Sequence, residues 1–174
     1  MQNPIKHNTK IRRGGKSIGG SKLKIISTNS QGDKFASLAS LVKSKNASVF
    51  MVQETNARKK GKHQLENFVI FESKRIKVGG GSMLGIHENL SPVLVSLYEN
   101  EFELIMVETN IGKRKIRIIT GYGPQEDWSD DIKAPFFVAL NTEISKAIVG
   151  GKSLYIAMDA NFKLGKKYIP QDPN

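Results

Sequence analysis

The sequence contains no cysteine among its 174 residues. Disulfide bonds and thiolate metal sites are therefore excluded, and this absence fits an intracellular location, the nucleus included. No apolar run approaches the roughly 20 residues that a transmembrane helix needs. The basic N-terminus also lacks the apolar segment of a secretory signal.

Acidic residues are missing from the first 24 positions, which carry seven of the lysines and arginines. The formal net charge of the whole chain is +11. A charge of this size implies an anionic partner, most often nucleic acid and less often an anionic membrane surface. We interpret residues 1–22 as a disordered basic arm that contacts phosphates through side chains such as Arg12 and Arg13. A solubilising leader, or a linker to an upstream domain, explains the same composition equally well.

Hydrophobic residues make up 39% of the chain and charged residues 25%, which is typical of a folded domain. The length suffices for one domain with a sizeable hydrophobic core and is too short for two such domains. Apolar periodicity predicts a strand over 23–29, a helix, and a buried strand over 47–53. The apolar stripe expected on that helix is Phe35, Leu38, Leu41 and Val42.

A run of short strands without helices follows, which we interpret as an antiparallel meander. The expected strands cover 68–71, 82–86, 93–97, 102–108 and 115–120. Pro135 suits the first turn of a second helix, whose expected stripe is Phe137, Leu140, Ile144 and Ile148. This helix leads to a strand over 153–159, whose poor alternation predicts burial on both faces.

Polar side chains follow several of these strands at the point where each strand ends. They are Asn29, Glu54, Tyr122, Asp159 and Asn161. Because parallel strands end at the same edge of a sheet, we expect Asn29 and Glu54 to share one edge. Taken singly, each of these residues also fits a turn, a solvated surface or a packed ring. Together, oxygen ligands without cysteine on a basic protein favour metal-assisted phosphoester hydrolysis over a zinc site.

Five segments, in this order, resemble the endonuclease/exonuclease/phosphatase superfamily, which includes DNase I, abasic-site endonucleases and inositol-polyphosphate phosphatases. They are Ser-Thr-Asn at 27–29, Val-Gln-Glu-Thr at 52–55, the glycine-rich segment 79–85, Tyr-Gly-Pro at 122–124 and Met-Asp-Ala-Asn-Phe at 158–162. The last two resemble the endonuclease domains of non-LTR retrotransposons most. The resemblance implies an α/β fold of two facing, mostly antiparallel β-sheets flanked by helices, the DNase I-like four-layer sandwich.

The resemblance also implies roles for the residues that follow the strands. Glu54 would bind Mg²⁺ or Mn²⁺ with Asn29 beside it, and Asp159 would orient or activate the attacking water. Asn161 and Tyr122 would hold the phosphate and stabilise its developing charge. DNA would then be the partner, and a membrane would not.

The sequence departs from the family pattern in two places. Met158 stands where the family usually has glycine, and we expect it to crowd the turn before Asp159. The family also continues to a further Asp and a closing Ser-Asp-His segment, and none of His7, His63 and His87 fits the role of that histidine. We therefore expect residues 23–174 to be an incomplete domain without its last strands, followed by a C-terminal remainder or further domains of the same polypeptide. Because a general acid–base group contributes about 10²–10⁴-fold, this chain alone should be inactive or weak.

Two alternatives to a DNA endonuclease stay open from the sequence. An inositol or lipid phosphatase of the same superfamily acts on an equally anionic substrate, so charge does not separate the two. A catalytically dead nucleic-acid-binding remnant would keep the fold without the chemistry.

Overall fold

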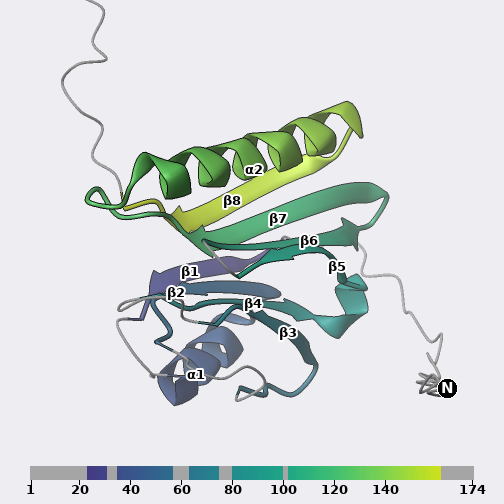
Figure 1. The fold of residues 1–174 in the computed structure, drawn as a ribbon. Helices are drawn as coiled ribbons and strands as arrows, with labels where there is room; N and C mark the ends of the chain where they lie inside the picture. The colour runs from purple at the N-terminus through teal and green to yellow at the C-terminus, as the bar shows by residue number, and fades with distance from the viewer. Residues whose placement is uncertain (1–22, 31–34, 57–62, 75–79, 100–101, 162–174) are drawn as a thin grey trace, which may run out of the picture.

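Two four-stranded β-sheets face each other, and one helix covers the outer side of each sheet (Figure 1). The computed structural model describes residues 23–30, 35–56, 63–74, 80–99 and 102–161. The basic arm, with Arg12 and Arg13, lies outside the described residues. The four layers are α1, the first sheet, the second sheet and α2, which is the sandwich that the sequence motifs predicted.

The first sheet has the strand order β1-β2-β4-β3 and the second has β5-β6-β7-β8. The elements in chain order are β1 (Ile25–Asn29), α1 (Phe35–Lys45), β2 (Val49–Gln53), β3 (Phe68–Glu72), β4 (Ser82–His87), a short 3₁₀ turn η1 (Glu88–Leu90), β5 (Val93–Tyr98), β6 (Glu103–Ile111), β7 (Arg114–Tyr122), α2 (Asp130–Val149) and β8 (Ser153–Asp159). Among the described strands, β1 pairs with β2 and β7 with β8 in parallel, and the other pairs are antiparallel.

The expected single meander is wrong, because the chain passes from one sheet to the other between β4 and β5. The β3–β4 hairpin belongs to the first sheet, and only β5, β6 and β7 form a meander in the second. Each strand of that run was recognisable from its own residues. The assignment to a sheet depends on pairings with β2 and β8, which are distant in sequence.

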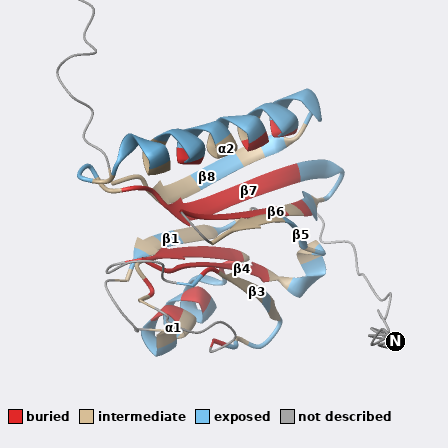
Figure 2. Ribbon diagram, in the orientation of Figure 1, coloured by how far each residue is buried: buried red, intermediate tan, exposed pale blue. Residues whose placement is uncertain are grey.

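The hydrophobic core has three parts, one between the sheets and one under each helix (Figure 2). Alternate residues of the central strands serve different parts. Val49 and Met51 of β2 pack between the sheets, whereas Phe50 and Val52 pack against α1. This double burial explains why β2 is an unbroken apolar run in the sequence.

Helix α2 differs from the sequence expectation at its start and on its packed face. It begins at Asp130 after the N-cap residue Ser129, so Pro135 lies in the second turn and not the first. The buried residues are Phe136, Glu143 and Ala147. Leu140 and Ile144 of the predicted stripe pack on the core under α2, whereas Phe137 and Ile148 are 38% and 64% exposed. The packed face carries the ion-paired acid Glu143, which broke the apolar periodicity and shifted the predicted stripe.

Strand β8 is the edge strand of the second sheet, so the expected burial on both faces is wrong. Ser153, Tyr155 and Ile156 are exposed, because β7 is its only neighbour among the described strands. Met158 is a residue of β8 that pairs with Gly121 and packs on the core under α2. It therefore does not crowd a turn. No helix in the described residues is long and apolar enough to cross a membrane.

Candidate active site

The carboxyl ends of β1 and β8 meet where the two sheets come together. The amide nitrogen Nδ2 of Asn29 donates to Oδ2 of Asp159 over 2.9 Å. Since each of these residues ends an edge strand, the bond closes the two sheets against each other at one end of the sandwich. The structure therefore brings together two side chains that the sequence predicted for one site.

Glu54 follows β2 immediately and lies next to the end of β1. Asn29 is the register partner of Gln53, and the Ser30 hydroxyl donates to the carbonyl oxygen of Glu54 over 3.0 Å. The expected common edge for Asn29 and Glu54 is confirmed by this parallel pairing. Glu54 adopts a left-handed backbone with φ of 54°, a conformation that is uncommon for residues other than glycine, Asn and Asp.

Asp159 and Asn161 form a compact turn against the end of β7. The backbone N–H of Asn161 donates to Oδ1 of Asp159 over 3.2 Å, and Nδ2 of Asn161 donates to the carbonyl oxygen of Gly123 over 3.0 Å. The N–H of Gly123 donates in turn to the carbonyl oxygen of Asp159 over 2.7 Å. Any Cβ at Gly123 would lie 2.7 Å from the oxygen of Ala160. Glycine in the Tyr-Gly-Pro segment thus allows β7 and β8 to approach closely at the site.

Tyr122 is the register partner of Asp159 at the end of β7. The residue is only 4% exposed, and its hydroxyl oxygen accepts from Nε2 of Gln125 over 3.0 Å. Because this bond uses a lone pair of the oxygen, the hydroxyl hydrogen is left to act as a donor. No sequence motif indicated a role for Gln125, and the available signal was its place directly after Pro124.

Two polar ties between the sheets support this edge, and sequence reasoning missed both. Nε2 of Gln53 donates to the hydroxyl of Thr120 over 2.9 Å, which joins β2 to β7. The second tie joins the buried carboxylate of Glu103, at the start of β6, to Gly81 directly before β4 and to Ser82, the first residue of β4. A charged residue directly before the apolar run Leu104–Val107 was the available signal for Glu103.

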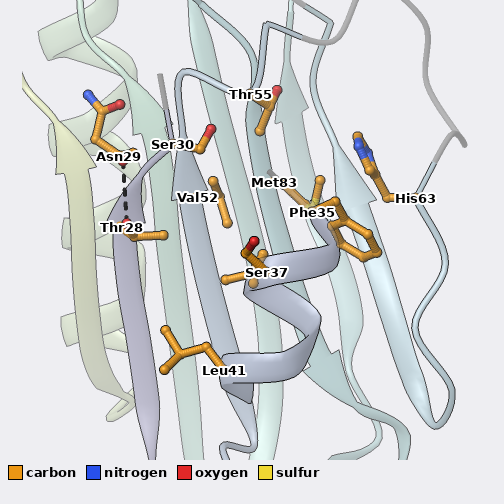
Figure 3. Close-up of a pocket in the computed structure, with 11 residues that line it drawn as sticks. Thr28, Asn29, Ser30, Phe35, Ser37, Leu41, Val52, Thr55, His63 and Met83 are labelled. Atoms are coloured by element: carbon orange, nitrogen blue, oxygen red, sulfur yellow. Dashed lines mark hydrogen bonds between the residues drawn. The ribbon is translucent and has the colours of Figure 1, made fainter. Parts of the chain in front are cut away.

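A cavity of about 290 Å³, lined in part by Asn29, lies between α1 and the first sheet (Figure 3). Asn29 and His63 line its opposite ends. His63 is buried, its Nδ1 lies 2.6 Å from Oε1 of Glu72, and its ring packs on Phe35. This histidine therefore packs α1 against the sheet and does not face Asp159.

The donor set at the edge fits a hard divalent cation. Glu54, Asn29 and Asp159 offer carboxylate and amide oxygens, the ligands that Mg²⁺ and Mn²⁺ prefer. Within the described part of the chain, no three His, Asp or Glu side chains form a cluster that holds a metal by itself. Mg²⁺ usually keeps several waters and binds through one or two carboxylates plus a substrate phosphate, so a sparse set of this kind suffices.

No protein-family model matches the sequence, and none of the curated proteins matches it. Solved structures match the fold. TDP2 from D. rerio, complexed with a single-strand DNA product, is 16% identical with a TM-score of 0.59 over 81% of this chain and 61% of its own. The endonuclease domain of TRAS1, a telomere-specific non-LTR retrotransposon, is 17% identical with a TM-score of 0.55 over 82% of this chain and 60% of its own. A mannosyl-6-phosphatase from Bacteroides thetaiotaomicron is 13% identical with a TM-score of 0.55 over 84% and 68%.

The chain therefore has the DNase I-like fold that its motifs predicted. The matched proteins include an endonuclease domain and a phosphatase, so the shared fold alone does not select the substrate. The chain spans less than two thirds of the length of the TDP2 and TRAS1 structures.

Proposed function

We propose that this chain carries the catalytic edge of a divalent-metal-dependent phosphodiesterase that cleaves DNA. The observation that supports the proposal most is the hydrogen bond between Asn29 and Asp159. It joins two of the predicted catalytic side chains, from strands that lie in different sheets, at the edge where Glu54 also lies. Core packing does not require a polar bond at this exposed position.

Each side chain at the edge has a role that its chemistry allows. The carboxylate of Glu54 and the side-chain oxygen of Asn29 would hold Mg²⁺ or Mn²⁺. A bound divalent cation would supply charge stabilisation at the phosphate. Nδ2 of Asn29 holds the Asp159 carboxylate in place, and that carboxylate is positioned to orient a water and to accept its proton.

Two further donors would hold the phosphate. The side-chain amide of Asn161 has two N–H groups, and the bond to Gly123 leaves one for a phosphate oxygen. The hydroxyl of Tyr122, whose oxygen accepts from Gln125, keeps its own hydrogen for the same purpose. Donors placed where charge develops are often the largest single contribution to such catalysis.

DNA is favoured over an inositol or lipid phosphate by the distribution of charge. Seven basic residues precede β1 in the sequence without an acid among them. A long anionic backbone can contact such an arm and the catalytic edge together, and a small phosphate ester cannot. We place Arg12 and Arg13 among these phosphate contacts. His63 bonds to Glu72, and His87 lies at the other end of β4 from Ser82, the partner of Gln53. Because neither described histidine is placed at the catalytic edge, we expect weak turnover by this chain alone and more by a C-terminally extended form.

The test is nicking of supercoiled plasmid with Mg²⁺ by the chain and by a C-terminally extended form. E54Q and D159N are compared with E88Q, which changes an exposed acid of η1 outside the catalytic edge. We expect Mg²⁺-dependent nicking that E54Q and D159N abolish and E88Q leaves intact. DNA binding without nicking by either form would favour the dead binding remnant. Release of phosphate from inositol phosphates without nicking would favour the phosphatase.

A further inference from the structure

The carboxylate of Glu103 is buried between the two sheets at the same end as the catalytic edge. It opens β6, pairs in register with Tyr122, and is 2% exposed. The N–H of Gly81 donates to both of its oxygens over 2.9 Å. The hydroxyls of Ser73 and Ser82 donate to Oε2 over 2.9 and 3.2 Å. A carboxylate is an acceptor-only group, so it matches these three converging donors as an amide does not.

The segment held by Glu103 in turn holds the residues that follow Glu54. The N–H of Thr55 donates to the carbonyl oxygen of Gly81, and the N–H of Asn56 to that of Gly80, each over 3.0 Å. Gly81 has φ of 97°, a backbone conformation that suits glycine. Both faces of this peptide segment are therefore used: its N–H binds Glu103 and its carbonyls bind the chain after Glu54.

Glu54 needs such support because of its own backbone. A left-handed conformation is unfavourable at a residue with a Cβ, and a conformation of that kind persists only where its surroundings fix it. The Ser30 hydroxyl holds the carbonyl of Glu54 from one side. The bonds of Thr55 and Asn56 to the segment under Glu103 hold the following peptides from the other.

We propose that Glu103 is a positioning residue for Glu54. It fixes Gly81, Gly81 fixes Thr55, and Thr55 keeps the Glu54 carboxylate at the edge beside Asn29. The inference rests on the proposed function, because it matters for catalysis only if Glu54 binds the metal. Glu103 itself lies behind the edge and touches neither metal nor substrate. The tie between Gln53 and Thr120 already joins the sheets here, so joining the sheets does not by itself account for Glu103.

The experiment compares E103Q with E143Q. Glu143 is an equally buried glutamate, also 2% exposed, but it pairs with Arg117 under α2, outside the catalytic edge. Two quantities are measured on the full chain: Mn²⁺ affinity by electron paramagnetic resonance, and exchange of the Thr55 and Asn56 amides by NMR. Exchange is normalised to core amides of β6, which separates local opening from global destabilisation.

We expect E103Q to weaken Mn²⁺ binding by about 10–100-fold, the usual effect of losing a partner behind a metal ligand, and to speed exchange of the Thr55 and Asn56 amides. E143Q should change neither after normalisation. If E103Q does not fold, E103D replaces it, because the shorter side chain keeps the charge but withdraws from Gly81. Equal effects of E103Q and E143Q, or unchanged Thr55 exchange in the folded Glu103 variant, would overturn the inference.

The same experiment separates this inference from the proposed function. E54Q is included in the Mn²⁺ titration. If E54Q binds Mn²⁺ as the unaltered chain does, the proposed metal site is wrong, and with it the catalytic importance of Glu103. Amide exchange still decides whether Glu103 fixes the backbone after Glu54.

Discussion

The amide nitrogen of Asn29 lies 2.9 Å from Oδ2 of Asp159, although the two residues are 130 positions apart in the sequence. Each is the last residue of its strand, and the two strands are edge strands of different sheets. Their bond therefore depends on how the whole sandwich closes. In return it holds the carboxylate that we propose to orient the attacking water.

The first prediction concerns this bond. N29A removes the donor to Asp159 and one proposed metal ligand, so Mg²⁺-dependent nicking should fall by about 10–100-fold. The free energy of unfolding should change little, since the bond is exposed to solvent. S27A is the matched control, because Ser27 is an exposed residue of the same strand. Equal nicking by N29A and S27A would show that Asn29 has no part in the chemistry.

Most of the fold was predictable from the sequence, and the errors have a common physical cause. The elements at both ends of the chain and the strands between them were recognisable, since apolar runs mark buried strands. The packed face of α2 was predictable only in part, because Glu143 occupies it as a buried ion pair with Arg117. A pairing between residues this far apart in sequence leaves no mark on local periodicity.

For the site, the motifs indicated the residues at the strand ends but not their support. Asn29, Glu54 and Asp159 belong to segments that resemble a known family. Gln53 and Glu103 are polar residues at the ends of apolar runs, and their partners become evident only when the two sheets face each other. Supporting residues of this kind are defined by three-dimensional contacts, so a single sequence shows at most that a polar residue is out of place.

The second prediction concerns Gly123, where β7 and β8 approach most closely. A Cβ there would meet the oxygen of Ala160 at 2.7 Å, so G123A must move the turn that carries Asn161. We expect a loss of about 1–3 kcal/mol in the free energy of unfolding, the usual cost of overpacking, together with loss of nicking. Urea unfolding and the plasmid assay measure the two effects.

The control for that substitution is G112A. Gly112 lies in the turn between β6 and β7 with φ of 59°, and nothing lies within 4 Å of an added Cβ. The change costs backbone strain of about 1–2 kcal/mol without a clash. If G112A lost nicking as G123A does, global stability and not the local approach of β7 to β8 would control activity.

The third prediction concerns Tyr122 and Gln125, which should act as one unit. Y122F removes the hydroxyl donor, and we expect nicking to fall by about 10²–10³-fold, as for loss of one transition-state donor. Q125A keeps the donor but releases its orientation, so its effect should be smaller. The double variant should then be no worse than Y122F alone, because the role of Gln125 passes through the hydroxyl. Rates that multiply in the double variant would contradict this dependence.

The last prediction concerns pH and the ion pairs under α2. Burial raises the pKa of Glu108, but hydrogen bonds from Lys152 and Arg117 outweigh burial and hold the pKa below its ordinary value of 4.5. A carboxyl whose pKa is lower in the folded state stabilises the fold above its unfolded pKa and loses that effect as the pH falls through the folded pKa. E108Q lacks the titrating group. The difference in Tm between the unaltered chain and E108Q should therefore stay constant from about pH 7 to about pH 5.5 and shrink below about pH 4.5.

E66Q, which changes an exposed acid outside this ion-pair cluster, should follow the unaltered chain over the whole range. The opposite result would be an unaltered chain that melts below E108Q at pH 7 and approaches it towards acid pH. It would mean that Glu108 is destabilising when charged, and that burial and not the two cations sets its pKa.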